Sequence, residues 1–297
     1  MPSPELQMVI DLLRGAPPVP REASFVEQRA ALEALTATAP PAADVSVTPV
    51  DAGGVPAAWV AAPGARADRT ILYLHGGGYC IGSIRTHRQL AADLSRATAA
   101  RLLLLDYRLA PEHPFPAAVD DAVCAYRWLL DRPADPQHIA IAGDSAGGGL
   151  TAATLLALRD QRQALPAAGV CLSPWLDLTL SGRSMDAKAA ADPMVQRAAL
   201  QRMADAYVAG GDVRAPLASP LFGDLVGLPP LLLQVGTAET LLDDATRFAE
   251  RARSAGGDVT LEMWDDMVHV WHAFAFVLPE AREAIDKIAA FLDERWS

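Results

Sequence analysis

The stretch HIAIAGDSAGGG, residues 138–149, decides the fold of this chain. Its first five residues form a short apolar run typical of a buried strand, and its last residues lead into a helical stretch. The corner between them is a G-x-S-x-G sequence centred on Ser145. Glycines on both sides of Ser145 allow a sharp strand-to-helix turn that exposes the hydroxyl above the sheet, beside the N–H groups of the helix N-terminus. The stretch therefore predicts a nucleophilic serine.

Two other interpretations of this corner compete with a nucleophile. A glycine-rich loop can simply begin a helix, with Ser145 as its N-cap. A phosphate-binding loop is disfavoured, because the lysine of the G-x-x-x-x-G-K-[S/T] pattern is absent and no G-x-G-x-x-G sequence is formed. A nucleophilic serine needs a base and an anion-binding site elsewhere in the chain.

Short β-rich runs alternate with helical stretches on both sides of this corner. From residue 70 onward the runs are 70–78, 101–108, 138–145, 167–174, 229–236 and 258–264. Two further strands, 45–50 and 57–63, precede them and are joined by a turn at DAGG. Strands alternating with helices predict an α/β fold, with a mostly parallel sheet of about eight strands flanked by helices on both faces.

A segment without β-rich runs interrupts this alternation. We divide the chain into N-terminal cap helices (1–44), a first part of the core (45–178), a cap insertion (179–218) and a second part of the core (219–297). An insertion at the carboxyl edge of a parallel sheet would lie above the crevice where ligands bind. The division therefore predicts a helical cap over the site.

Composition excludes several classes of partner. A net charge of −11 disfavours binding to nucleic acid and to anionic lipids. No apolar run is long enough to span a membrane, and the N-terminus lacks the features of an export signal, so we expect a cytoplasmic protein. The three cysteines and six histidines show no metal-ligand spacing, so we expect neither a metal nor a cofactor.

A second glycine loop follows an earlier strand. In LYLHGGG, residues 72–78, three consecutive glycines leave backbone N–H groups open to a ligand, as the stabilisation of a developing oxyanion requires. The alternative is a flexible turn. Because both glycine loops follow strands, we expect them at one edge of the sheet.

The base must be a histidine at the same edge. His269 and His272 follow the last predicted strand, whereas His138 precedes one and therefore lies at the wrong edge. We favour His269, the nearer of the two to the strand end. Either could instead pack among the neighbouring aromatic residues.

An acidic residue after the preceding strand should orient the histidine. Glu239 falls in the loop, while Asp243 and Asp244 fall in the first turn of the next helix, where the helix dipole alone can explain them. Glu239 is therefore favoured. The order of nucleophile, acid and histidine along the chain is that of the α/β-hydrolases.

Four motifs, HGGGYCIGS, DYRLAPEHPFPAAVDD, GDSAGGGL and DMVHVWHAF, together resemble the hormone-sensitive-lipase-like family of esterases, with matches from residue 71 to residue 275. The resemblance implies an α/β-hydrolase fold with a helical cap. It also implies oxyanion donors at the N–H groups of Gly77, Gly78 and Ala146. The acid of this family is usually an aspartate, so Glu239 departs from the common pattern and Asp243 stays a lesser candidate.

The resemblance and the predicted residues imply a serine carboxylic-ester hydrolase for small to medium acyl esters, with lactones as further substrates and an acyl-enzyme intermediate. Ser145, His269 and Glu239 would form its triad, with no cofactor. The alternatives are a non-catalytic small-molecule-binding protein of the same fold and an amidase. A homodimer is expected from the family.

Overall fold

The computed structural model describes residues 2–15, 23–37, 43–132 and 135–296. Within these ranges the chain forms one sheet of eight strands in the order β1-β2-β4-β3-β5-β6-β7-β8. The strands are β1 (Ser46–Asp51), β2 (Pro56–Ala61), β3 (Arg66–Leu74), β4 (Ala100–Leu105), β5 (Ile139–Asp144), β6 (Ala168–Leu172), β7 (Leu231–Gly236) and β8 (Val259–Trp264). Strand β2 pairs antiparallel with β1 and β4, and all other neighbours are parallel. The predicted architecture is confirmed.

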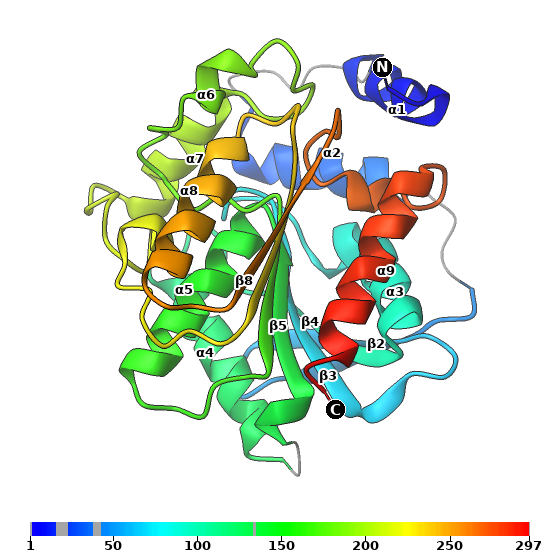
Figure 1. Ribbon diagram of the computed structural model, residues 1–297, viewed down its shortest axis with the longest axis vertical. Coiled ribbons are helices and arrows are strands. Elements are labelled where there is room, and N and C mark those ends of the chain that lie inside the picture. Colours follow the sequence, from blue (N-terminus) through cyan, green and yellow to red (C-terminus); the bar gives the residue numbers. More distant parts are fainter. Residues whose placement is uncertain (1, 16–22, 38–42, 133–134, 297) are drawn as a thin grey trace.

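Helices cover both faces of this sheet (Figure 1). The α-helices are α1 (Pro4–Gly15), α2 (Phe25–Thr36), α3 (Ile84–Thr98), α4 (Ala117–Leu130), α5 (Ala146–Asp160), α6 (Ser184–Ala187), α7 (Arg197–Val208), α8 (Leu242–Ser254) and α9 (Pro279–Asp293). Short 3₁₀ turns are η1 (Pro136–His138), η2 (Pro220–Phe222) and η3 (Trp271–Phe274). Helix α3 begins at Ile84, directly after the N-cap residue Ser83, whose N–H donates to the Thr86 hydroxyl over 2.9 Å.

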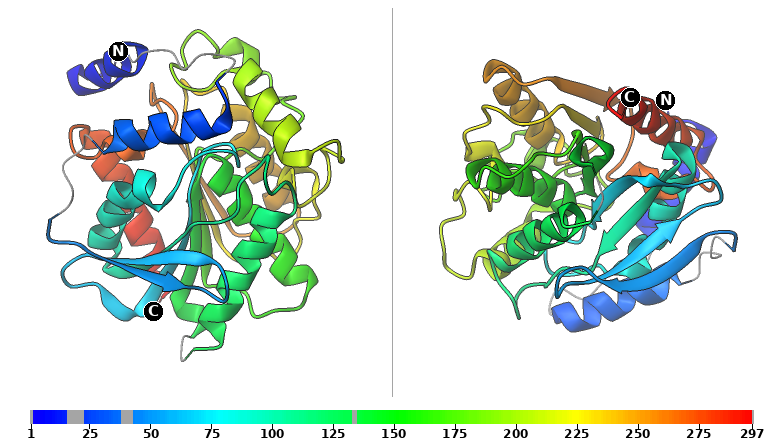
Figure 2. Two further views of the ribbon diagram at one scale, coloured as in Figure 1. Left: turned by 180° about the vertical axis from the view of Figure 1, so that it is seen from behind. Right: turned by 90° about the horizontal axis from the view of Figure 1, so that it is seen from below.

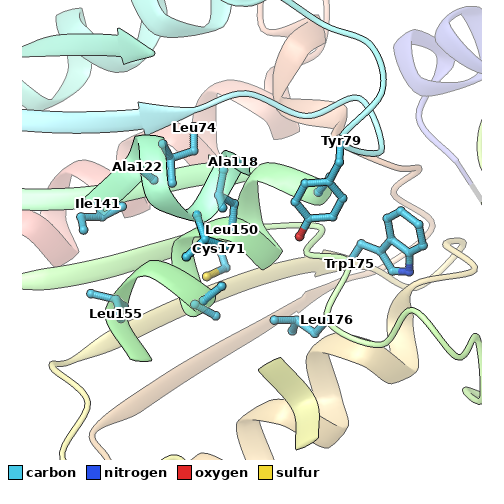
Figure 3. Packing of buried hydrophobic residues seen from close by; sticks show 14 of the residues in the cluster. Leu74, Tyr79, Ala118, Ala122, Ile141, Leu150, Leu155, Cys171, Trp175 and Leu176 are labelled. Carbon is cyan, nitrogen blue, oxygen red and sulfur yellow. The ribbon is translucent and has the colours of Figure 1, made fainter. Parts of the chain in front are cut away.

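The two faces of the sheet carry two separate hydrophobic cores. Successive side chains of a strand point to opposite faces, so Leu72 and Leu74 pack with helices α4, α5 and α8. Ile71 and Tyr73 pack instead with α3, α9 and α1. Figure 3 shows the first core, where Leu74 lies among side chains of α4, α5 and β6. Burial on both faces fixes the register of the strands and hence the height at which each strand ends.

The N-terminal helices and the insertion lie at one end of the sheet. Segment 179–218 contains α6 and α7 and no strand, and Figures 1 and 2 place α1 and α2 at the same end as these helices. Arg14 Nη2 donates to the carbonyl of Ala190 over 3.4 Å, and Arg202 Nη2 donates to the carbonyl of Ala23 over 2.6 Å. These contacts support our proposal that the two parts form one cap.

In the described ranges, every helix is too short or too polar to cross a bilayer.

Candidate active site

Ser145 occupies a strained corner between β5 and α5. Its backbone adopts φ 53° and ψ −120°, a conformation that residues other than glycine rarely adopt. Its N–H donates to Leu172 O (2.8 Å), and its carbonyl accepts from Trp175 N (2.9 Å). Ser145 is the N-cap residue of α5 by position, but its hydroxyl makes no capping bond to the helix. The backbone of the corner therefore fixes the position of the Ser145 side chain, and the hydroxyl is not needed to cap the helix.

The glycines around Ser145 are required by close backbone approach. A Cβ added to Gly147 would lie 1.9 Å from Leu74 O, and one added to Gly143 would lie 2.3 Å from Gly147 O. No side chain fits at these distances. The G-x-S-x-G pattern thus lets the start of α5 pack directly on the end of β3 beside Ser145.

The second glycine loop follows β3 and lies beside this corner. Gly77 and Gly78 adopt φ 118° and 60°, and a Cβ on Gly77 would lie 2.1 Å from Ile81 O. Among the described residues, the N–H groups of Gly77, Gly78 and Ala146 have no hydrogen-bond acceptor. Three free donors close to the serine match the donor set that the family resemblance predicts.

Asp144, directly before the serine, joins the two loops. Its carboxylate accepts from the Gly76 N–H (3.1 Å) and from the Tyr73 hydroxyl (2.8 Å), and it pairs with His87 Nε2 at 3.3 Å. Burial alone would raise the pKa of Asp144, but the His87 charge, with these hydrogen bonds, lowers it to about 2. Asp144 is therefore a structural anion that fixes the glycine loop.

Glu239 and His269 form a buried pair on the loops after β7 and β8. The imidazole Nδ1–H donates to Glu239 Oε2 over 2.9 Å, and Glu239 is completely buried. The other oxygen, Oε1, accepts from Gly236 N over 2.7 Å. This arrangement leaves Nε2 of His269 free to accept a proton.

The two aspartates that follow Glu239 have other partners. Asp243 accepts from the N–H groups of Arg183 and Ser184, in the cap insertion. Asp244 accepts from the N–H groups of Leu176 and Asp177, after β6. Both lie in the first turn of α8, yet they bind backbone of other segments, so the interpretation from the helix dipole is incomplete. Within the described ranges, His269 forms its hydrogen bond with Glu239 and none with either aspartate.

Ser173 is a site residue that the sequence analysis missed. It follows β6, is completely buried and adopts φ 45°. Its hydroxyl donates to Glu239 Oε1 over 2.7 Å and accepts from the Val270 N–H over 3.0 Å. One side chain thus connects the loop of the acid with the loop of the histidine. The available signal was a serine directly after a buried strand, at the same edge as Ser145.

The two candidate histidines have different electrostatic environments, which shift their pKa values in opposite directions. Burial lowers the pKa of His269, but the Glu239 hydrogen bond and charge, together with Asp192 and Asp144, raise it above its ordinary value. His272 Nε2–H donates to Gln234 Oε1 over 2.8 Å, and burial lowers the pKa of His272 to about 3. His272 is a neutral core residue, and His269 is the better proton acceptor.

The structure brings both halves of the site to the carboxyl edge of the sheet. Leu172, which accepts from the Ser145 N–H, directly precedes Ser173, which binds the Glu239 loop. In the part of the chain described, no hydrogen bond joins the Ser145 hydroxyl to His269. Such bonds are often long in ligand-free enzymes and tighten when substrate binds.

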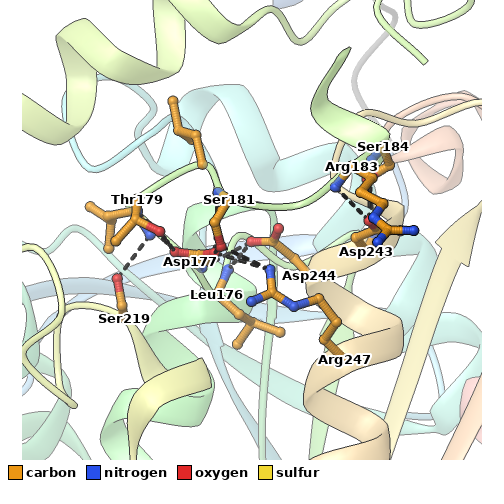
Figure 4. Close-up of polar contacts among 12 residues, drawn as sticks. Leu176, Asp177, Thr179, Ser181, Arg183, Ser184, Ser219, Asp243, Asp244 and Arg247 are labelled. Carbon is orange, nitrogen blue, oxygen red and sulfur yellow. Dashed lines mark hydrogen bonds and ion pairs between the residues drawn. The ribbon is translucent and has the colours of Figure 1, made fainter. Parts of the chain in front are cut away.

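A polar cluster anchors the start of the cap insertion to the core (Figure 4). Asp177 is completely buried and accepts from Thr179, Ser181 and Arg247. Burial, with the neighbouring Asp177 charge, raises the pKa of Asp244 to about 8 against the N–H groups and the arginine that lower it. Burial thus shifts the carboxyl group of Asp244 toward its neutral form.

The cap also contacts the glycine loop through apolar side chains. Tyr207 of α7 stacks on Tyr79 with ring centroids 3.8 Å apart, and Tyr79 lies beside Trp175 (Figure 3). A Cβ on Gly78 would lie 2.1 Å from Met203 Sδ. Met203, which is partly buried, therefore borders the predicted oxyanion donors from the cap side.

Comparison with known proteins agrees with this geometry. A sequence model of the alpha/beta hydrolase fold matches residues 71–273. The acetyl-hydrolase of Streptomyces hygroscopicus is 48% identical over 98% of this chain and 97% of its own length. A crystal structure of an esterase from the bacterial hormone-sensitive lipase family is 50% identical, with a TM-score of 0.96 over 100% of both chains. EstE5, crystallised and soaked with p-nitrophenyl butyrate, is 48% identical, with a TM-score of 0.96 over 99% of both chains.

The family match covers most of the chain, so the protein belongs to the α/β-hydrolase family. The sheet order and the two glycine loops are those expected of that fold. Within the family it is one of the hormone-sensitive-lipase-like carboxylesterases. The predicted fold and the predicted resemblance are confirmed.

Proposed function

We propose that the protein hydrolyses small to medium acyl esters through a triad of Ser145, His269 and Glu239. The single observation that carries this proposal is the buried Glu239–His269 pair, 2.9 Å apart, at the sheet edge where β5 delivers the serine. Burial excludes water, so the carboxylate can fix the imidazole tautomer and stabilise the imidazolium that forms during reaction.

The reaction proceeds in two steps. His269 Nε2 accepts the Ser145 proton as the serine oxygen attacks the ester carbonyl, and the N–H groups of Gly77, Gly78 and Ala146 stabilise the oxyanion. His269 then gives the proton to the leaving alcohol, which yields an acyl-enzyme. Water, deprotonated by the same imidazole, attacks the acyl group and releases the acid, and the serine recovers its proton.

The cap favours substrates of modest size. Met203 and the stacked pair of Tyr79 and Tyr207 border the glycine loop, so an acyl or alcohol group at the site would meet apolar, close-packed surface. The names of two relatives, an acetyl-hydrolase and an esterase soaked with p-nitrophenyl butyrate, agree with short acyl chains. Lactones, which are internal esters, would use the same serine chemistry.

The experiment measures p-nitrophenol release from acetyl, butyryl, octanoyl and palmitoyl esters by the wild type and by Ser145→Ala. We expect the highest kcat/KM for acetyl or butyryl ester and a loss of about 10⁶-fold in kcat in the variant. Equal rates in the two proteins contradict the triad, and a maximum at palmitoyl ester contradicts the small substrate. A panel of lactones and p-nitroanilides then separates lactonase and amidase activity from ester hydrolysis.

A further inference from the structure

Asp192 is a buried carboxylate of the cap insertion, between α6 and α7. It is 2% exposed. Its Oδ1 accepts from the N–H groups of Met194 and Val195, each over 2.9 Å. Its Oδ2 binds the core, where it accepts from the Thr240 N–H over 2.9 Å and from the Thr240 hydroxyl over 3.1 Å. One carboxylate thus ties a turn of the cap to the core.

The core residue that it binds is adjacent to the acid of the triad. Thr240 directly follows Glu239, and the same threonine hydroxyl also lies 3.4 Å from Val195 O of the cap. The cap therefore holds the loop that carries the acid. The loop is thus held from both sides, by Ser173 of the core at Glu239 and by Asp192 of the cap at Thr240.

The charge of Asp192 is not neutralised by a cation. All four of its hydrogen-bond donors are uncharged, and among the described residues no lysine or arginine forms an ion pair with it. A buried negative charge without a counterion acts over several ångströms on a group that can become positive. His269 is such a group, and the charge of Asp192 acts on it.

We propose that Asp192 is a positioning residue for ester hydrolysis, through which the docked cap holds the Glu239 loop and favours the imidazolium form of His269 in the transition state. This inference rests on the proposed function. The cap would then take part in the chemical step in addition to enclosing the substrate. Its position would decide whether the Asp192 charge lies near His269.

The electrostatic environment of His269 supports the inference. The groups that act on it are Glu239 from its own side of the site, Asp192 from the cap and Asp144 from the end of β5, and all three raise its pKa. His272, on the same loop, is held neutral. Removing the Asp192 charge should therefore lower the pKa of His269. Since ester hydrolysis requires the neutral imidazole, the acid limb of the pH profile should move to lower pH.

The test compares Asp192→Asn with Asp243→Asn. Both aspartates link the cap to the core through backbone N–H groups, but Asp243 is not among the charges that act on His269. For p-nitrophenyl butyrate, we expect the acid limb of kcat/KM to shift down by about 0.5–1 pH unit in Asp192→Asn and to stay in place in Asp243→Asn. Asp192→Glu, which keeps the charge, should lower the plateau without moving the limb.

Asparagine offers one acceptor oxygen where Asp192 uses two, so Asp192→Ser is a second neutral variant, whose hydroxyl can still accept an N–H in the same turn. A readout independent of turnover is the ¹⁵N titration of the His269 imidazole in the Ser145→Ala background. A titration that does not move in either neutral variant overturns the inference, even if the plateau falls. A wild type that hydrolyses no ester overturns the proposed function instead.

Discussion

The two halves of the proposed active site are built by different physical means. Around Ser145, backbone packs on backbone so closely that a Cβ on Gly147 would lie 1.9 Å from Leu74 O. Around Glu239 and His269, buried side chains exchange hydrogen bonds that reach across 66 and 97 residues of sequence through Ser173. The serine half is fixed by shape, and the acid–histidine half is fixed by polar partners.

This difference determines what each half tolerates. A steric arrangement fails when volume is added, whereas a polar arrangement fails when a donor, an acceptor or a charge is removed. In the serine half, a substitution that adds volume at a glycine should therefore cost the fold. The acid–histidine half should respond with loss of rate or with a change in pH dependence.

The largest effect is expected from Gly147→Ala. The added methyl group meets backbone atoms that cannot rotate away, so we expect destabilisation by more than about 3 kcal/mol or no folded protein. Urea unfolding provides the measurement. Gly15→Ala is the control, since a Cβ there meets nothing within 4 Å, and it should change stability by less than about 1 kcal/mol. A Gly147→Ala protein as stable as the wild type would contradict the steric interpretation.

Glu239→Gln should leave the fold intact and lower kcat by about 10³- to 10⁴-fold, because an amide can stabilise the wrong imidazole tautomer and carries no charge for the imidazolium. Asp243→Asn, the control at the alternative acid, should stay within a few-fold of the wild type. Steady-state kinetics with p-nitrophenyl butyrate measures both. The assignment of the acid is wrong if the two variants lose rate equally.

Ser173→Ala removes a donor from Glu239 and an acceptor from the Val270 N–H, so we expect kcat/KM to fall about 10- to 100-fold. Ser219→Ala is a matched control. Ser219 is also completely buried and also donates one hydrogen bond (to Val213 O) and accepts one (from Leu178 N). Both variants should lose similar stability, measured by urea unfolding, but only Ser173→Ala should lose rate. Similar kcat/KM values for the two would reduce Ser173 to a packing role.

The last effect, which is spread over several pH units, concerns the pH dependence of stability near the acid. The pKa of Asp244 is raised in the folded state to about 8 from an ordinary value of 3.8. The folding stability that the protonated carboxyl group contributes is therefore fully present below pH 4 and is lost as the pH rises through about 8. Asp244→Asn removes this dependence. The stability difference between variant and wild type should therefore grow in favour of the variant from pH 5 to pH 9, by at most about 1.4 kcal/mol per pH unit. Urea midpoints at pH 5, 7 and 9 measure it, and a constant difference would refute the raised pKa.

The contrast between a serine half fixed by shape and an acid–histidine half fixed by polar partners also explains which parts of the structure the sequence predicts. The corner at Ser145 is local, since its strand, its glycines and its helix occupy one continuous stretch. Glu239 and His269 could be predicted because each follows a recognisable strand. Distance from the strand end alone favours His269 over His272. In the structure His272 binds Gln234, a strand residue whose side-chain direction no local pattern reveals.

Ser173 and Asp192 could not be predicted in this way. Each acts through a buried contact with a segment at least 48 residues away, and neither lies in a motif whose spacing indicates a partner. Buried polar groups are nearly always paired, but the sequence alone does not say with what.

The bond between Asp192 and Thr240 limits how this protein can be re-engineered. Grafting a foreign cap in place of residues 179–218 would bring a new substrate pocket while leaving the backbone amide of Thr240 without its acceptor, next to Glu239. A chimera would therefore bind its new ester and turn it over slowly, unless the graft also carried an oxygen to that amide.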